Sequence, residues 1–352
     1  MPDPAPENLR HDTPWWDRDR HAGRRPLLLA RGRIQAAIRD WLAAQDFLEI
    51  DPCALAVSPG NEAHLHGFET RMIGNDGAAV PMYLHTSPEF AMKKLLAAGE
   101  ERIFSLGHVW RNRERTARHH PEFTMLEWYR VGQDYRVLFD DCTAFLRLAA
   151  EQAGAEHLQH RGLTCDPYAA PQVLSVAEAF AEFAGIDLLA TCAGAETDAA
   201  ALTAQARARG IRIGDDDTWS DMLSRILVEK VEPHLGMGVP LILDRYPAAE
   251  AALARPAADP REAERFELYA CGVELANGFG ELTDPVEQRR RFQLEMDEKS
   301  RVYDERYPLD EDFLAALAFM PPASGCALGF DRLVMLATGA PRIDEVIWTP
   351  LP

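Results

Sequence analysis

Two glutamates, Glu274 and Glu281, stand seven residues apart on either side of an Asn-Gly pair. This spacing allows their carboxylates to converge from a strand and the loop that follows it. Two carboxylates together with the oxygens of a triphosphate supply the hard oxygen ligands that Mg²⁺ prefers. The alternative is a pair of solvated surface charges. Glu274 and Glu281 are therefore candidate ligands for a Mg²⁺ ion.

The segment from Phe123 to Val131 alternates as a half-buried strand does. Phe123, Glu127 and Tyr129 point to one face, together with Met125, and the intervening residues point to the other. One face therefore carries an aromatic ring, a carboxylate and a phenol. A purely structural role for Phe123 in the core is the alternative.

Hydrophobic spacing predicts the elements that must position these residues. A helix is expected to start at Pro88 and run to Gly99, and Ser175 with Glu178 forms a capping box at the start of another. The other expected helices are Leu29–Gln45, Val137–Gly154, Pro285–Arg306 and Asp310–Phe319. The other expected strands are Phe47–Ile50, Val80–Thr86, Arg102–Trp110 and Leu241–Leu243. Strands come early and late with helices between them, which favours an α+β fold with an antiparallel sheet flanked by helices.

The chain is expected to form one catalytic domain over residues 26–352. Residues 1–25 carry charges and prolines without periodicity, so we expect a polar N-terminal tail. An alanine-rich, weakly patterned stretch at about 155–217 is expected to be a helical insertion.

Composition narrows the class of function. A net charge of −19 repels a polyanion, which counts against tRNA or DNA as a partner. Six cysteines without a C-x-x-C pair argue against a disulfide framework and against a thiolate zinc site. No run of about 18 apolar residues and no signal peptide is present, so we expect a cytoplasmic protein without a membrane partner.

Common nucleotide and metal motifs are missing. There is no P-loop, and Gly236-Met237-Gly238 lacks the third glycine of a dinucleotide fingerprint. His64 and His66 lie close to Glu62, but no third metal ligand follows at a recognised spacing. This pattern favours structural histidines over a metal site.

Five blocks of sequence carry a specific resemblance. They are Thr86-Ser87-Pro88-Glu89 followed by Met92-Lys93, Arg111-Asn112-Arg113-Glu114, the segment from His119 to Tyr129, Glu274–Leu282 and Gly325–Arg332. Together they resemble the catalytic core of class II lysyl-tRNA synthetases, and most closely the short paralogue family that attaches lysine or (R)-β-lysine to elongation factor P. The resemblance covers about residues 28 to 350. It implies a homodimeric ligase that makes a lysyl or (R)-β-lysyl adenylate from ATP and passes the acyl group to a lysine side chain of elongation factor P.

The resemblance assigns an ATP site with Mg²⁺. Arg111 would bind the α-phosphate, where its planar fork suits two oxygens better than a lysine would, and Arg332 would close on adenine opposite Phe123. We take these two arginines as the catalytic residues. The remaining ATP-binding positions are Asn112, Arg113, Glu114, Glu274, Leu275 and Gly329. Arg113 stands where the family has a glutamate, and Glu114 follows one place later.

The resemblance also assigns an amino-acid site. Its residues are Ser87, Pro88, Glu89, Glu127, Tyr129 and Glu281. Glu89 would take the amino group near the carboxylate, and Glu127 with Tyr129 would take the side-chain ammonium, because an ammonium leaves water only when a carboxylate or phenol receives it. Ala327 replaces a synthetase glycine, and its methyl could shift preference toward β-lysine by about 1–3 kcal/mol.

Three alternatives remain open at this point. A truncated synthetase could still charge tRNA, although only about 25 polar residues precede the core, too few for an anticodon-binding barrel. A ligase making a small amide, like the ammonia-dependent asparagine synthetase, would need no protein acceptor. An inactive regulatory paralogue is expected to lack Arg111, Glu274, Glu281 or Arg332, and all four are present.

Overall fold

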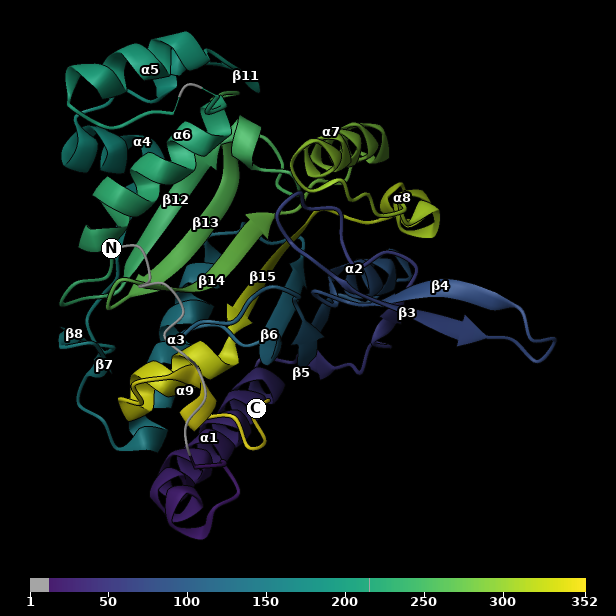
Figure 1. Ribbon diagram of the computed structural model, residues 1–352, viewed down its shortest axis with the longest axis vertical. Coiled ribbons are helices and arrows are strands. Elements are labelled where there is room, and N and C mark those ends of the chain that lie inside the picture. Colours follow the sequence, from purple (N-terminus) through teal and green to yellow (C-terminus); the bar gives the residue numbers. More distant parts are fainter. Residues whose placement is uncertain (1–12, 215) are drawn as a thin grey trace.

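An eight-stranded sheet forms the centre of the molecule in the computed structural model, which describes residues 13–214 and 216–352 (Figure 1). In spatial order the strands are β1 (Leu48–Glu49), β5 (Arg102–Trp110), β6 (Glu122–Val131), β15 (Ala323–Gly329), β14 (Val273–Gly280), β13 (Glu262–Ala270), β12 (Leu241–Pro247) and β9 (Gln172–Ser175). Neighbours from β5 to β12 are antiparallel, whereas the edge strands β1 and β9 pair in parallel. The predicted α+β fold is confirmed, with a mixed rather than purely antiparallel sheet.

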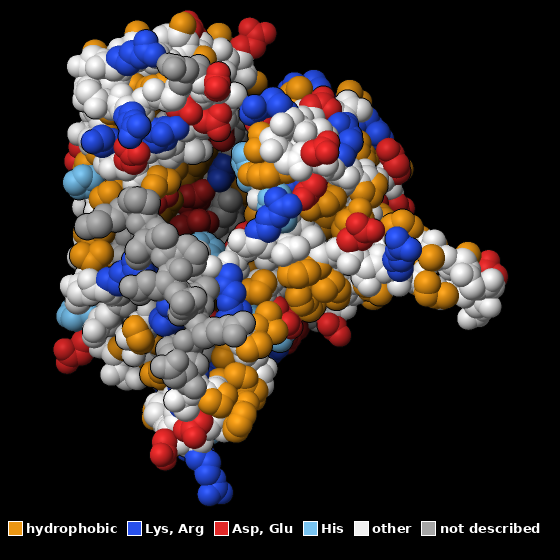
Figure 2. Space-filling model, in the orientation of Figure 1, with side chains coloured by type: hydrophobic (Ala, Val, Ile, Leu, Met, Phe, Trp, Pro, Cys, Tyr) orange, Lys and Arg blue, Asp and Glu red, His pale blue; other side chains and the backbone are white. Residues whose placement is uncertain are grey.

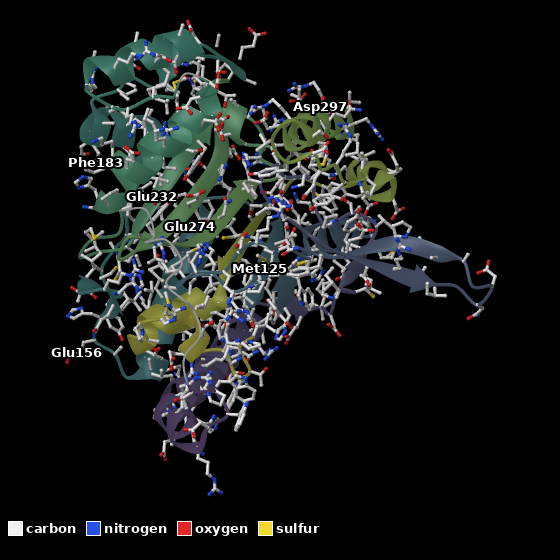
Figure 3. All side chains as sticks on the ribbon, viewed as in Figure 1. Met125, Glu156, Phe183, Glu232, Glu274 and Asp297 are labelled. Carbon is white, nitrogen blue, oxygen red and sulfur yellow. The ribbon has the colours of Figure 1, made fainter. Side chains whose placement is uncertain are left out.

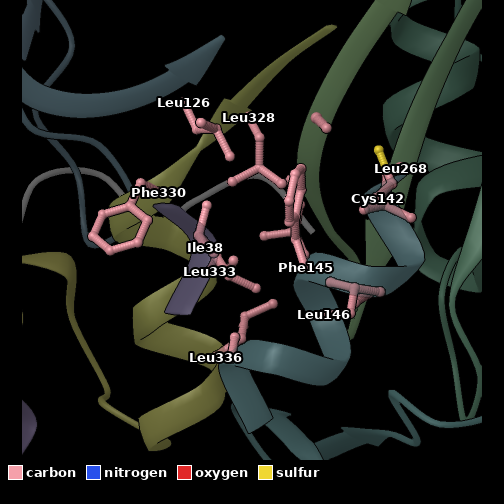
Figure 4. Packing of buried hydrophobic residues seen from close by; sticks show 14 of the residues in the cluster. Ile38, Leu126, Cys142, Phe145, Leu146, Leu268, Leu328, Phe330, Leu333 and Leu336 are labelled. Atoms are coloured by element: carbon pink, nitrogen blue, oxygen red, sulfur yellow. The ribbon is translucent and has the colours of Figure 1, made fainter. Parts of the chain in front are cut away.

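Three helices cover one face of the sheet. They are α1 (Arg18–Ala44), α3 (Val137–Ala153) and α9 (Phe330–Thr338). Leu126 and Leu328 from the central strands pack against Phe145, Leu333 and Leu336 of these helices (Figure 4). Each fully buried leucine contributes about 1.5–3 kcal/mol relative to an exposed one. This face is the main core, and it holds β6 and β15 in place from behind.

The opposite face is only partly covered. Helices α2 (Glu89–Ala97), α7 (Pro285–Tyr303) and α8 (Glu311–Leu317) pack at the β5 side of the sheet. There Phe90 of α2 stacks on Phe313 of α8 with ring centroids 4.2 Å apart. The strands β2 (Leu55–Ala56), β3 (Phe68–Ile73) and β4 (Ala79–Leu84) form a small sheet whose β3–β4 hairpin projects from the body (Figure 1). The uncovered part of the large sheet is where a ligand can reach it.

A helical lobe covers the far edge of the sheet over residues 176–234. It contains α4 (Val176–Ala179), α5 (Ala199–Ala208), α6 (Trp219–Ile226) and two π-helical turns (Phe180–Ala184 and Leu227–Val231). Its core includes Leu241 and Leu243 of β12. The predicted bounds of 155–217 are wrong, because β9 lies within them and belongs to the main sheet, where it pairs with β12. The capping box of Ser175 and Glu178 is confirmed.

Short elements complete the description. The remaining strands are β7 (Leu158–His160), β8 (Leu163–Cys165), β10 (Cys192–Ala193) and β11 (Glu196–Thr197), and the 3₁₀ turns are Leu189–Thr191, Glu232–His234, Ala248–Glu250 and Ile343–Glu345. Within residues 13–214 and 216–352, no helix is both long and apolar enough to cross a membrane. All six cysteines are free.

The first helix differs from the prediction. It begins at Arg18 rather than Leu29, so the expected tail is wrong for residues 18–25, and residues 1–12 lie outside the described chain. Asp17 caps the helix by accepting from the backbone N–H groups of Asp19 and Arg20. Arg24 is buried and donates to the carbonyl of Asp344 at 3.0 Å. Apolar spacing did not predict the first turns of α1, because a charged residue, and not an apolar one, contacts the C-terminal segment.

Candidate active site

A cavity of about 300 Å³ lies on the uncovered sheet face. Figure 2 shows this face hollowed between the helical lobe and the α7–α8 side, with acidic side chains inside. Phe123, Met125, Glu127 and Tyr129 of β6 line it, so the predicted alternation of that strand is confirmed. Met125 and Glu274 reach the cavity from different strands, β6 and β14 (Figure 3).

Most of the predicted site residues meet in this cavity. Those that line it are Ser87, Glu89, Arg111, Glu114, Phe123, Glu127, Tyr129, Glu274, Leu275, Gly329 and Arg332. Ala327, singled out for selectivity, also lines it and stands directly opposite Glu127 in the β15–β6 pairing. The chain thus collects residues from five separate blocks of sequence around one space.

One end of the cavity is acidic. Glu127 is buried and accepts hydrogen bonds from Ser87 Oγ at 2.6 Å and from the Tyr129 hydroxyl at 2.7 Å. Burial and the nearby charge of Glu89 raise the pKa of Glu127 to about 8, despite these two hydrogen bonds. The carboxyl therefore takes up a proton near neutral pH unless a cation arrives. A ligand ammonium would supply that cation.

Lys93 is a component of the acidic end whose role sequence reasoning did not identify. Its ammonium, fully buried, lies 2.6 Å from Glu281 Oε2 and also pairs with Glu89. Burial disfavours the charge of Lys93, but Glu281 and Glu89 raise its pKa, so it stays protonated. The spacing of Glu89 and Lys93, four apart on a predicted helix, was the available signal. Glu281, predicted to bind the substrate, is buried and does not line the cavity, and burial raises its pKa to about 7.

The floor beside Glu281 requires glycine. A Cβ atom on Gly325 would collide with the Tyr129 ring and with the Glu281 carboxylate. Because Gly325 has no side chain, the Tyr129 ring and the Glu281 carboxylate can lie directly against the backbone of β15.

The other end of the cavity is rich in arginine. The Arg111 guanidinium lies over the Phe123 ring, 5.4 Å from its centroid, and Arg111 Nε donates to the carbonyl of Thr86 at 3.3 Å. Arg332 Nη1 donates to the carbonyl of Glu274 at 2.9 Å, and Arg332 Nη2 lies 2.7 Å from His119 Nε2. These contacts hold both guanidinium groups at the cavity wall, where phosphate oxygens and an aromatic base could bind them.

The expected convergence of Glu274 and Glu281 is wrong. Strand β14 stays extended through Asn277, which pairs with Glu267 on one side and Ala327 on the other, so no turn forms there. Seven residues of strand span about 23 Å. Glu274 therefore lies near the start of β14, and Glu281 directly follows its end.

Glu267 is the carboxylate that accompanies Glu274 instead. Burial, followed by the charge of Glu267, raises the pKa of Glu274 to about 7. Glu267 is directly opposite Asn277, and Asn277 lines the cavity, so the two share that face of the sheet. Among the described residues, no three His, Cys, Asp or Glu side chains cluster as a metal-binding group. Two carboxylates with phosphate oxygens are the fitting donor set for a hard cation here.

Three predicted residues face elsewhere. Asn112 and Arg113 line a separate depression, where Arg113 pairs with Glu305 and its guanidinium lies 5.7 Å from the Tyr303 ring centroid. Arg113 has a φ of +66°, and it is Glu114 that lines the cavity. Pro88 lines a second cavity that adjoins the first.

The two histidines take structural roles. His64 Nδ1 lies 3.0 Å from the Tyr303 hydroxyl, and His66 Nδ1 lies 3.0 Å from Glu305 Oε2. Both contacts tie the loop before β3 to the end of α7.

The sheet, the cavity and its two ends define a class II synthetase catalytic domain, and the family model described as tRNA synthetases class II (D, K and N) matches residues 6–351. The elongation factor P–(R)-β-lysine ligase of Vibrio cholerae is 37% identical over 330 residues, which cover 92% of this chain and 95% of that protein. The corresponding ligase of Proteus mirabilis is 39% identical over 328 residues, with 92% and 94% covered.

The chain therefore belongs to the class II synthetase family and, within it, to the family of elongation factor P–(R)-β-lysine ligases. This membership makes it an ATP-dependent ligase. The class works with ATP and a divalent metal ion.

Proposed function

We propose that this ligase activates lysine or (R)-β-lysine with ATP and transfers the acyl group to a lysine side chain of elongation factor P. The observation that carries the proposal is the polarity of the cavity, which has buried carboxylates at one end and two arginines at the other. The names of the relatives point to the same substrate and acceptor.

The acidic end would bind the two ammonium groups of the amino acid. Glu127, already held by Ser87 and Tyr129, would receive the side-chain ammonium, and Glu89 would receive the amino group near the carboxylate. Because these carboxylates are partly or fully removed from water, a ligand without a matching ammonium leaves them unpaired. This requirement supports selection of a diamine acid.

The arginine end would carry out activation. The substrate carboxylate would extend toward Arg111, whose guanidinium stabilises the negative charge that builds on the α-phosphate as the carboxylate attacks and pyrophosphate leaves. Phe123 and Arg332, which line the same cavity, would hold adenine between them. No side chain needs to form a covalent intermediate, because positioning and charge stabilisation are sufficient.

Glu267 and Glu274 are the residues that would hold Mg²⁺. Burial first, and then the charge of Glu267, raise the pKa of Glu274, so a bound cation would stabilise its charged form; Glu267 already pairs with Arg265 at 2.8 Å. The ion supplies charge neutralisation on the triphosphate when bound.

We further propose (R)-β-lysine as the preferred isomer and a homodimer as the active form. The Ala327 methyl stands opposite Glu127 and reduces the space beside the bound chain, which supports a substrate whose amino group is shifted by one carbon. Because the acceptor is a translation factor, the reaction belongs in the cytoplasm.

The direct test incubates the protein with ATP, Mg²⁺, purified elongation factor P and either lysine isomer, followed by intact-mass spectrometry of the factor. We expect the mass of the factor to increase by one lysyl unit. The modification should be faster with (R)-β-lysine than with lysine, and it should not occur without ATP. Charging of lysine tRNA with no change in the factor would indicate the tRNA ligase instead. Amide formation from ammonia alone would indicate a small-molecule ligase.

A further inference from the structure

A second cavity of about 240 Å³ adjoins the first. Its walls are largely apolar, with Leu55 and Val57 near its outer side and Phe90 and Phe292 deeper among the helices. It shares four lining residues with the first cavity, namely Glu62, Ser87, Glu89 and Leu253. The two cavities therefore meet at an acidic junction.

The shape and polarity of this second cavity fit a lysine side chain that enters from outside. Apolar walls suit the four methylene groups, and the acidic junction suits the terminal ammonium. The amino acid and ATP would occupy the first cavity, so a protein acceptor needs another entrance. The junction lies beside Arg111, the residue expected at the activated carboxyl group.

Glu62 stands at that junction on a loop that is held rigidly. The neighbouring Ala63 donates its N–H to Glu295 Oε2 at 2.8 Å, and its carbonyl accepts from Lys299 Nζ at 2.9 Å. On the other side, Asn61 Nδ2 donates to the carbonyl of Pro308 at 3.3 Å. These bonds fix the backbone on both sides of Glu62, while its own side chain points into both cavities.

The charged groups around Glu62 come from several elements. Desolvation by the surrounding protein raises its pKa to about 7, although the residue keeps an exposed surface; Glu89 on α2 and Glu295 on α7 raise it further, while Arg111 and Arg265 act in the opposite direction. A carboxylate of this kind is able to accept a proton near neutral pH. Neither the binding of ATP nor the binding of the amino acid uses it.

We propose that Glu62 is the catalytic base of the transfer step, and that it receives the ammonium of the acceptor lysine through the second cavity. This inference rests on the proposed function, because it needs an acyl adenylate and a lysine acceptor.

The step balances as follows in atoms and charge. The Glu62 carboxylate takes one proton from the acceptor ammonium, and the freed nitrogen lone pair forms the new bond to the acyl carbon. The bond from that carbon to the phosphate oxygen breaks, and AMP leaves with the electron pair. The second proton of the attacking nitrogen leaves with the phosphate of AMP, which yields a neutral amide.

The test separates activation from transfer in the variant Glu62→Gln. ATP–pyrophosphate exchange with (R)-β-lysine measures activation, and single-turnover transfer to elongation factor P measures the second step. We expect the ratio of transfer rate to exchange rate to fall by about 100-fold or more, the usual contribution of a general base. Hydroxylamine, which is largely uncharged at pH 7, should still capture the adenylate at close to the wild-type rate.

The pH profile supplies a readout that a structural role would not move. Wild-type transfer should rise with pH and level near pH 7, where Glu62 ionises, whereas Glu62→Gln should lose that inflection and rise toward the ionisation of the acceptor amine. Glu62→Asp should recover part of the rate. The matched control is Glu196→Gln, an exposed glutamate on β11 of the helical lobe, which should change nothing.

Three outcomes would overturn the inference. Equal losses of exchange and transfer in both Glu62 variants would place Glu62 in activation or folding. Wild-type transfer by Glu62→Gln would remove it from the reaction. If the wild-type protein forms the adenylate but never modifies elongation factor P, the proposed function itself fails, and the failure is visible before any variant is made.

Discussion

The two ends of the active-site cavity solve opposite electrostatic problems. At the acidic end, Glu127 is buried and its pKa is raised to about 8, so a proton partly neutralises it when no ligand is bound, whereas buried Glu281 pairs with the ammonium of Lys93. At the other end, Arg111 and Arg332 lie against an aromatic ring and backbone carbonyls. The acidic end is therefore suited to bind cations, and the arginine end is suited to bind phosphate.

Under the proposed function, this difference explains how one cavity would align a diamine acid with ATP. Buried carboxylates reject any ligand that does not bring an ammonium, because leaving them ionised and unpaired is costly. Arginines at a more open wall accept the mobile oxygens of a triphosphate and stabilise charge as it moves. Selectivity is therefore assigned to the acidic end and rate to the arginine end.

The largest expected effect tests the arginine end. Arg111→Ala should lower ATP–pyrophosphate exchange by about 10³-fold, because it removes a cation aimed at the developing charge. The matched control is Arg113→Ala, two residues away, whose side chain pairs with Glu305 outside the cavity. It should stay within about threefold of wild type, since exposed ion pairs contribute little. Equal losses in both variants would contradict the placement of the two arginines.

Glu127→Gln tests the acidic end. We expect the KM for the amino acid to rise by about 100-fold, because a hydrogen-bonded charge partner of the ammonium is lost, while the KM for ATP stays constant. Glu122→Gln is the control, since Glu122 is on the same strand but is partly exposed and contacts His108. A shared rise in both KM values would show that the two ends are not separable.

Gly325→Ala tests how closely the floor is packed. The added Cβ meets the Tyr129 ring and the Glu281 carboxylate, so we expect a loss of about 1–3 kcal/mol in the free energy of unfolding, measured by denaturant titration. Gly329→Ala is the control, because a Cβ there would lie 3.6 Å from the Arg332 side chain, an ordinary contact. An equal change in stability for both variants would contradict the packing described here.

The pH dependence tests the protonated state of the empty acidic end. The folded protein binds more protons than the unfolded chain wherever burial raises a carboxyl pKa, so these groups lower stability as pH rises from about 4.5 to about 8. A diamine ligand should displace the protons bound to these carboxyl groups. Between pH 6 and pH 8, the affinity for the ligand should therefore increase by up to about tenfold per pH unit for each proton that is released on binding. Calorimetry in buffers of different ionisation enthalpy counts the protons, and a count of zero would be inconsistent with this picture.

Ala327→Gly should give the smallest effect. Removing the methyl opposite Glu127 should shift the ratio of kcat/KM for (R)-β-lysine over lysine by about tenfold toward lysine. An unchanged ratio would mean that selectivity between isomers depends on other residues.

Local patterns in the sequence predicted much of this site. The alternation of β6 placed Phe123, Glu127 and Tyr129 on one face, and the structure confirms that face as a cavity wall. Pro88 correctly marked the start of α2, as its N-cap residue. Both signals are short in range, because they depend only on the period of a strand or on the first turn of a helix.

Features set by distant contacts were not predictable in the same way. An Asn-Gly pair favours a turn, but the pairing of β14 with β13 and β15 keeps this segment extended. The extended strand separates Glu274 from Glu281, and Glu267 of β13 is the carboxylate that lies near Glu274 instead. Arg113 has a left-handed backbone conformation, and Glu114, not Arg113, lines the cavity. Arg24 is buried against carbonyls more than 300 residues later, so α1 shows no apolar stripe at its start.

The central claim is that the acidic end of the cavity selects a second ammonium before ATP is used. The most direct measurement compares ATP–pyrophosphate exchange driven by (R)-β-lysine, which is 3,6-diaminohexanoic acid, with exchange driven by (R)-3-aminohexanoic acid, which lacks only the terminal amine. We predict that kcat/KM falls by about 10³-fold or more for the monoamine, because Glu127 loses its cation. Equal exchange with both acids would contradict the account.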